Sequence, residues 1–94
     1  MLITIRLPSA FAASAGDQKR IQMNMDGEVS LGKLLDVLAA EYPGLRQAAG
    51  IGQENIPDHV NVYHNGENVR YLQGLKTPLK DGDTVQVIPA EAAG

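Results

Sequence analysis

One segment of the chain has apolar residues at helical spacing, whereas in the other apolar segments apolar and polar residues alternate. Between residues 30 and 42, the sequence SLGKLLDVLAAEY forms one apolar stripe on a helix, from the leucines at positions 31, 34, 35 and 38. Ser30 is a suitable N-cap, and Val29 can pack on Leu34 as a hydrophobic staple. The Pro-Gly pair at positions 43 and 44 is expected to end the helix. One amphipathic helix among strands predicts an α+β fold, with the helix on one face of a sheet.

Alternating residues predict a hairpin before this helix. Residues 2–7 and 21–25 each place apolar side chains on one face and polar ones on the other. The segment SAFAASAGDQ, residues 9–18, is interpreted as a loop of small residues between them.

The C-terminal half predicts a short helical turn at 46–49 and three further strands. Residues 60–63 alternate, and the Asn-Gly pair at 65–66 favours a tight turn into a short strand at 69–72. Residues 84–89 are partly apolar on both faces, which is typical of a central strand covered on two sides. The prediction is a mixed sheet of about five strands with one main helix packed on one face.

Composition limits what such a domain can do. A chain of 94 residues fits one domain, and a net charge of −3 argues against a surface that tracks phosphates. The absence of cysteine excludes disulfides and thiolate metal sites. No apolar run approaches the roughly 20 residues of a membrane span. Because Arg6 follows the first apolar residues and Pro8 interrupts the run, the start does not fit a signal peptide, and a cytoplasmic location is expected.

The polar side chains predict no catalytic or metal site. His59 and His64 are five positions apart without a nearby carboxylate pair, so we interpret them as ordinary residues at strand ends. Asp81 and Asp83 flank a glycine and are interpreted as turn formers. Arg70 is interpreted as a solvated charge on a strand. We expect no bound cofactor or metal.

The C-terminal half also resembles a known family. The resemblance is carried by HVNVYHNGENVR at 59–70, GL at 74–75 and LKDGDTVQVIPA at 79–90, which leads into a terminus of small residues. In this order the stretches resemble the ubiquitin-like β-grasp sulfur carriers of the MoaD/ThiS family, and within it the cysteine-biosynthetic carriers typified by CysO. The resemblance implies a β-grasp domain over residues 1–89 and a flexible C-terminal tail over residues 90–94.

The resemblance implies a protein cosubstrate rather than an enzyme. In the family, an E1-like enzyme uses ATP and magnesium to adenylate the terminal carboxylate, and sulfur then replaces AMP to leave a thiocarboxylate. Gly94 matches the reacting residue. Family members end in Gly-Gly, whereas Ala93 adds a methyl group here, where the partner's channel is expected to be tight. The tail residues expected to enter the partner are Pro89, Ala90, Glu91, Ala92 and Ala93.

The sequence leaves several functions open. Sulfide donation is favoured, with a pyridoxal-phosphate-dependent cysteine synthase as acceptor; molybdopterin, thiamin or a secondary metabolite are other products. The alternatives are a non-catalytic interaction module, which Ala93 favours, and a ubiquitin-like modifier whose Gly94 forms an isopeptide bond with a lysine. The expected partners are an E1-like adenylyltransferase or sulfurtransferase and a sulfur-accepting synthase, with neither nucleic acid nor membrane.

Overall fold

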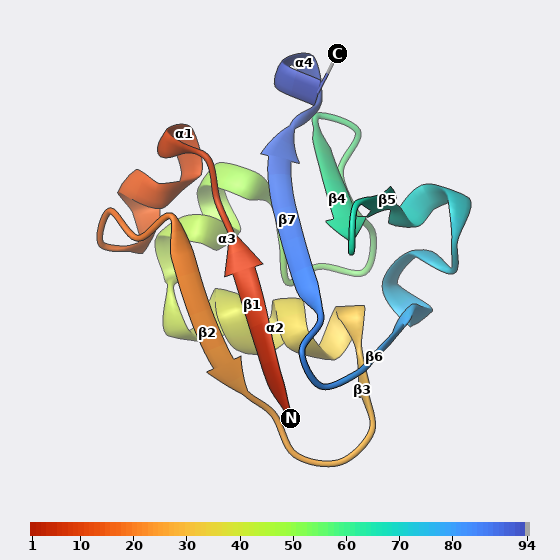
Figure 1. The fold of residues 1–94 in the computed structure, drawn as a ribbon. Helices are drawn as coiled ribbons and strands as arrows, with labels where there is room; N and C mark the ends of the chain where they lie inside the picture. Colours follow the sequence, from red (N-terminus) through yellow and green to blue (C-terminus); the bar gives the residue numbers. More distant parts are fainter. Residues whose placement is uncertain (94) are drawn as a thin grey trace.

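The fold is built on a five-stranded mixed sheet with the strand order β2-β1-β7-β4-β5 (Figure 1). The structure is a computed structural model that describes the backbone of residues 1–93 and the side chains of residues 1–91. The sheet contains β1 (Leu2–Arg6), β2 (Arg20–Asn24), β4 (Val60–His64), β5 (Glu67–Asn68) and β7 (Thr84–Pro89). A separate short pair joins β3 (Val29–Ser30) to β6 (Pro78–Leu79). The predicted hairpin of β1 and β2 and the five-stranded mixed sheet are confirmed.

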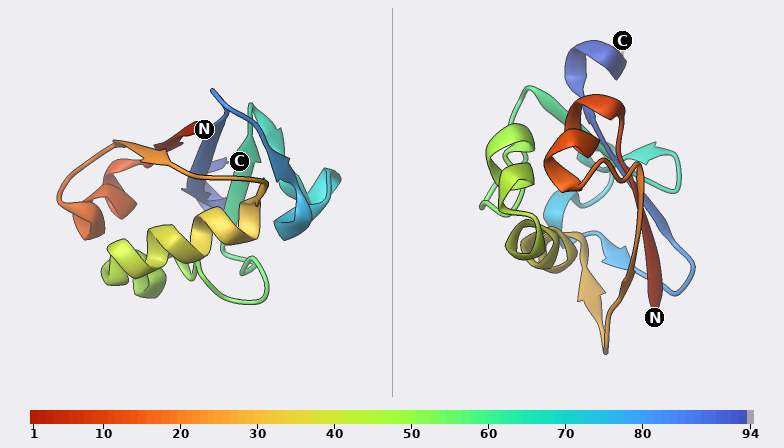
Figure 2. Two further views of the ribbon diagram at one scale, coloured as in Figure 1. Left: turned by 90° about the horizontal axis from the view of Figure 1, so that it is seen from below. Right: turned by 90° about the vertical axis from the view of Figure 1, so that its left-hand side faces the viewer.

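Helix α2 (Leu31–Glu41) lies across one face of the sheet, as the left-hand view of Figure 2 shows. Its N-cap is the predicted one, because the Lys33 N–H donates to Ser30 Oγ at 3.2 Å. Its leucine stripe is buried in the core. The helix ends at Glu41, but the following proline does not begin a loop. Pro43 is the first residue of helix α3 (Pro43–Ala49), a position where its missing N–H costs nothing, so this helix is longer than the predicted turn.

The prediction of a loop over residues 9–18 is wrong for residues 9–15. Ser9–Ala12 form helix α1, and Ala13–Ala15 continue it as a 3-10 turn (η1). Phe11, Ala12 and Ala15 are buried in the same core as the strands. Alanine is the best helix former. The turn approaches α3 closely at Ser14, where the glycine at position 44 leaves room. A Cβ on Gly44 would lie only 3.2 Å from the Ser14 carbonyl oxygen.

The short strand predicted at 69–72 is also misplaced. The turn before it is confirmed, since Asn65 and Gly66 both have positive φ, 50° and 89°. The strand that follows is β5, only two residues long, and the chain then enters 3-10 turns at Val69–Tyr71 (η2) and Gly74–Lys76 (η3). The side chain of Asn68 causes the change, because its Oδ1 accepts the Arg70 N–H at 3.0 Å and caps η2.

Strand β7 occupies the central position that its sequence predicts, between β1 and β4. Val85 and Val87 are fully buried against the helix layer. The prediction that both faces are covered is wrong, because Gln86 on the opposite face is exposed. Within the described part of the chain, no helix is long and apolar enough to cross a membrane.

Candidate functional site

The candidate site is the chain segment that leaves the sheet at the end of β7. β7 pairs in parallel with β1 from Thr84 to Gln86 and antiparallel with β4 from Val85 to Pro89. Its last residues therefore extend past the pairing with β1 and are held by β4 alone. β7, which carries the C-terminal segment, is thus paired with both β1 and β4 in its first half and with β4 alone at its end.

The backbone is tied to the sheet as far as Ala90. The Ala90 N–H donates to the His59 carbonyl oxygen at 2.9 Å, and both Pro89 and Ala90 are half-buried. Glu91 is exposed. Ala90–Ala93 form one helical turn, α4, which projects from the end of the sheet (Figure 1). The flexible tail over residues 90–94 stays a prediction, and Gly94, the predicted reacting residue, lies outside the described residues.

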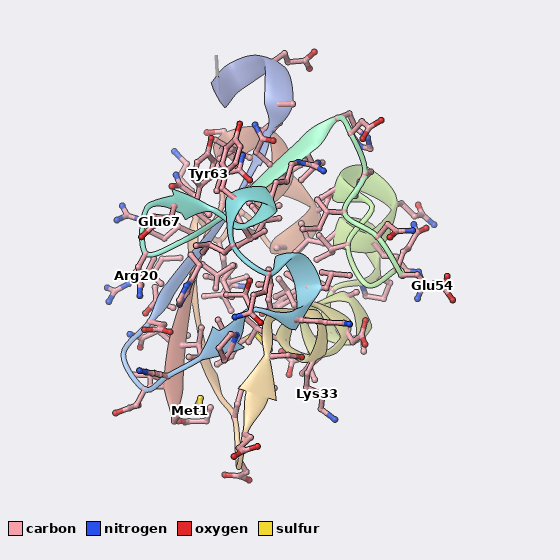
Figure 3. All side chains as sticks on the ribbon, turned by 90° about the vertical axis from the view of Figure 1, so that its right-hand side faces the viewer. Met1, Arg20, Lys33, Glu54, Tyr63 and Glu67 are labelled. Atoms are coloured by element: carbon pink, nitrogen blue, oxygen red, sulfur yellow. The ribbon has the colours of Figure 1, made fainter. Side chains whose placement is uncertain are left out.

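An open face of the sheet adjoins the base of this projection. Val60 and Val62 point into the core, so their neighbours Asn61 and Tyr63 point to the opposite side of the sheet. Cross-strand pairing places Asn61 opposite Ile88 and Tyr63 opposite Gln86. Figure 3 shows Tyr63 below the α4 turn, on the side away from α2. We call Asn61, Tyr63, Gln86 and Ile88 the tail-proximal face.

Sequence reasoning did not find the tail-proximal face. The signal was present in the alternation of residues 60–63, which marks the outward positions of β4. The pairing of β4 with β7, which brings those positions beside the projecting end, depends on the tertiary fold and is not readable from either segment alone.

His64 and Asp83 form a pair that the sequence did not predict. The His64 Nε2 and Asp83 Oδ2 atoms are 2.6 Å apart, and both side chains are mostly buried. Asp83 also accepts hydrogen bonds from Asn65 Nδ2 at 3.0 Å and from the Lys80 N–H at 2.8 Å. His64 lies at the end of β4, as predicted, but the interpretation of it as an ordinary side chain missed its carboxylate partner. The role of Asp83 as a turn former is confirmed. Among the residues that the structure describes, no group of three or more side chains could hold a metal ion.

Arg70 is exposed, as predicted, but it lies in the turn η2 and not on a strand, and it also has a structural role. Its Nη2 atom donates to the carbonyl oxygens of Pro57 and Val60, each at 2.9 Å. The guanidinium thus fastens the end of the 50–59 loop to the start of β4. Surface hollows lie beside this loop, next to Asp36 and Arg46, and none that the structure records is lined by the projecting segment.

The sheet order, the main helix α2 on one face and the projecting chain end define a ubiquitin-like β-grasp protein. The chain belongs to the ThiS family, whose model matches residues 10–94.

Curated relatives support this assignment over their whole length. The chain is 38% identical over 94 residues to small archaeal modifier protein 3 of Haloferax volcanii, and covers 100% of both proteins. It is 33% identical over 96 residues to the sulfur carrier protein CysO of Mycobacterium tuberculosis, again with 100% coverage of each. In the crystal structure of the Amycolatopsis orientalis BexX/CysO complex, one chain matches with a TM-score of 0.79 and 27% identity, over 94% of each chain.

The protein is therefore a sulfur carrier or small modifier of the ThiS family, and a carrier rather than a catalyst. The predicted likeness to the cysteine-biosynthetic branch is confirmed only at the level of the family, because the modifier protein is the more similar of the two relatives.

Proposed function

We propose that the carboxyl group of Gly94 is adenylated by an E1-like enzyme and converted to a thiocarboxylate that donates sulfide in biosynthesis. The observation that carries the proposal is the placement of the chain end. A central strand, paired on both sides, ends in a short projection, and the family match continues to residue 94.

The chemistry is two successive substitutions. The carboxylate oxygen attacks the α-phosphorus of ATP, the bond to pyrophosphate breaks, and an acyl adenylate forms. Hydrosulfide from a donor then attacks the acyl carbon, AMP leaves, and a thiocarboxylate remains. Oxidation states do not change. Magnesium bound to ATP in the partner would balance the phosphate charge. This chain supplies the carboxylate on a projecting chain end, and the reaction needs no cofactor bound to this chain.

The residues before Gly94 suit entry into a narrow site. Past the backbone bond from Ala90 to His59, the sequence is Glu-Ala-Ala-Gly, with only one long side chain. Residues 81–94 contain three acidic side chains, Asp81, Asp83 and Glu91, and no basic one. We expect a basic entrance on the activating enzyme, which would speed association at low salt. The tail-proximal face, with Tyr63 and Ile88 half-buried at its centre, is the surface that such a partner would contact first.

The partners are proposed as an E1-like adenylyltransferase or sulfurtransferase and a sulfur-accepting synthase. Support comes from the relative named CysO, and from the solved complex of a CysO with BexX. Cysteine formation by a pyridoxal-phosphate-dependent synthase is the favoured branch, with molybdopterin, thiamin or a secondary metabolite as other products. Because activation consumes ATP, we place the protein in the cytoplasm.

The test is an intact mass measured after incubation with the host's E1-like enzyme, ATP, magnesium and a sulfide source. The expected result is a chain in which one oxygen atom is replaced by sulfur, with the change located at Gly94 by fragmentation. A reaction without ATP is the control. An unchanged mass with an enzyme that activates another carrier would overturn the proposal.

A second function, protein modification, is favoured by the 38% identity to small archaeal modifier protein 3. The same activated carboxyl group would react with a lysine amine, with AMP or a thiol as the leaving group. In the mass experiment, supplemented with host lysate, this function predicts conjugates joined through Gly94. The third candidate, an interaction module without carrier activity, predicts binding to the enzyme with no change in mass.

A further inference from the structure

The two edges of the sheet differ in how they are protected. The β5 edge is two residues long and ends at once in the turn η2. The β2 edge is five residues long, and it contains no proline, glycine or bulge, since its register with β1 runs unbroken from Arg20 to Asn24. Its inward side chains, Ile21 and Met23, are apolar. A long, regular edge without these protections is a template for pairing with another strand.

The outward backbone groups of β2 belong to alternate residues. The Leu7 N–H donates to the Lys19 oxygen at 2.9 Å, and Met25 exchanges hydrogen bonds with Met1. Odd-numbered residues of β2 therefore bond to β1, and residues 20, 22 and 24 turn their N–H and C=O groups outward. The right-hand view of Figure 2 looks onto this edge, where no helix crosses the length of the strand.

We propose that the β2 edge pairs with the β2 edge of a second copy of this chain, antiparallel and centred on Gln22. In this register Gln22 faces its own copy, and Arg20 faces Asn24 of the second copy, twice by symmetry. All three facing pairs consist of residues with outward backbone groups, so each pair exchanges two hydrogen bonds. A register shifted by one residue would place each residue with outward backbone groups opposite one whose groups already bond to β1, and the ladder would be lost.

Charge favours a second copy over an unrelated strand. No like charges face each other directly, because Arg20 is the only charged residue of β2. In the same register Arg20 is diagonal to Asp26 of the second copy, and both side chains are exposed. The twofold axis repeats this contact, so the dimer contains two opposite-charge pairs.

The dimer leaves the carrier site free. β2 is separated from β7 by β1, so β7, the tail-proximal face and the projecting end take no part in the contact. Because the axis reverses strand direction, the two β7 strands run in opposite directions, and the two chain ends leave the joined sheet at opposite sides. The inference does not depend on the proposed function.

Sedimentation velocity of the full chain over a concentration series tests the proposal. The wild type is expected to change from monomer to dimer as concentration rises. Gln22→Lys places two like charges on the axis and is expected to raise the dimer dissociation constant by roughly tenfold or more. Gln86→Lys is the matched control, because Gln86 is exposed on the central strand β7. Circular dichroism confirms that both variants fold.

Charge reversal tests the register. Arg20→Glu and Asp26→Lys are each expected to weaken the dimer, and the double variant is expected to recover most of the loss. Three outcomes would overturn the proposal: a monomer at every concentration, a dissociation constant unaffected by Gln22→Lys, or a double variant no better than the singles. A chain that stays monomeric but binds an extended segment of another protein at β2 would also overturn it.

Discussion

The His64 imidazole lies 2.6 Å from the Asp83 carboxylate and joins the end of β4 to the residue before β7. Burial raises the pKa of Asp83, but hydrogen bonds from Asn65, His64 and the Lys80 N–H, together with the His64 charge, outweigh it. The pKa of Asp83 is therefore lowered from its ordinary value of 3.8. The carboxylate form is the one that the folded state prefers.

Asp83→Asn is expected to lower the stability of the protein at neutral pH by about 1 kcal/mol, through weaker hydrogen bonds. Because the folded-state pKa is depressed, the carboxylate's contribution is present above the unfolded value of 3.8 and is lost as pH falls through the folded value. The difference between wild type and variant should therefore shrink below about pH 4. Urea unfolding over a pH series measures this stability difference. Asp58→Asn is the control, because Asp58 is exposed. A difference that grows on acidification would contradict the lowered pKa of Asp83.

Arg70→Ala is expected to release the 50–59 loop from β4. The change removes two hydrogen bonds to the Pro57 and Val60 carbonyl oxygens, and we expect a loss of about 1–3 kcal/mol. Amide hydrogen exchange should rise in the loop and at the start of β4 but not in β1. Arg46→Ala removes a second exposed arginine, one for which the structure records no side-chain hydrogen bond. Equal exchange in the two variants would contradict the role given to Arg70.

Gly52→Ala and Gly27→Ala separate backbone strain from a steric clash. Both glycines have positive φ, 79° and 74°, so each substitution is expected to cost about 1–2 kcal/mol of strain. At Gly52 the new Cβ would also lie 2.7 Å from the Ala39 Cβ, whereas at Gly27 nothing lies within 4 Å. Overpacking should add about 1–3 kcal/mol at Gly52 alone. Thermal unfolding of both variants compares the costs, and equal values would show that α2 yields to the added methyl group.

Ala93→Gly is expected to speed activation by an E1-like enzyme. The variant gives the Gly-Gly ending that the family resemblance implies and removes a methyl group one residue from the carboxyl proposed to react. If the bound tail needs positive φ there, the gain is roughly tenfold in affinity, from about 1–2 kcal/mol of relieved strain. Deletion of Gly94 should prevent thiocarboxylate formation. ATP–pyrophosphate exchange measures the activation rate of both variants. Wild-type rates in both would mean that the chain end takes no part in activation.

Much of the fold was predictable because local pattern and tertiary burial agree. The strand at residues 84–89 and the N-cap at Ser30 are readable from the sequence, since both signals depend on neighbours in sequence. The errors arose where tertiary contacts decide. The small residues around Ala12 and Ala15 are typical of a loop, but their burial in the core stabilises a helical turn. The sequence predicts only a solvated charge at Arg70, because the two carbonyl oxygens that it contacts are brought near by the tertiary fold.

Part of the candidate site is likewise predictable from the sequence, and part depends on the tertiary fold. The small residues after Pro89 and their resemblance to a carrier terminus are visible in the sequence. The tail-proximal face is not, because it needs the cross-strand pairs of β4 with β7. The pairing of His64 with Asp83 was missed for the same reason: the two residues are 19 positions apart in the chain.

The bilateral pairing of β7 also has a mechanical consequence. A partner that grips the chain end and pulls would load β7 along its own axis, in shear against parallel β1 and antiparallel β4. Ladder hydrogen bonds loaded in shear share the force, whereas an edge strand peeled from its end would yield one bond at a time. Traction on the tail is thus resisted by the central strand of the sheet, so the domain can be held by its end without unfolding.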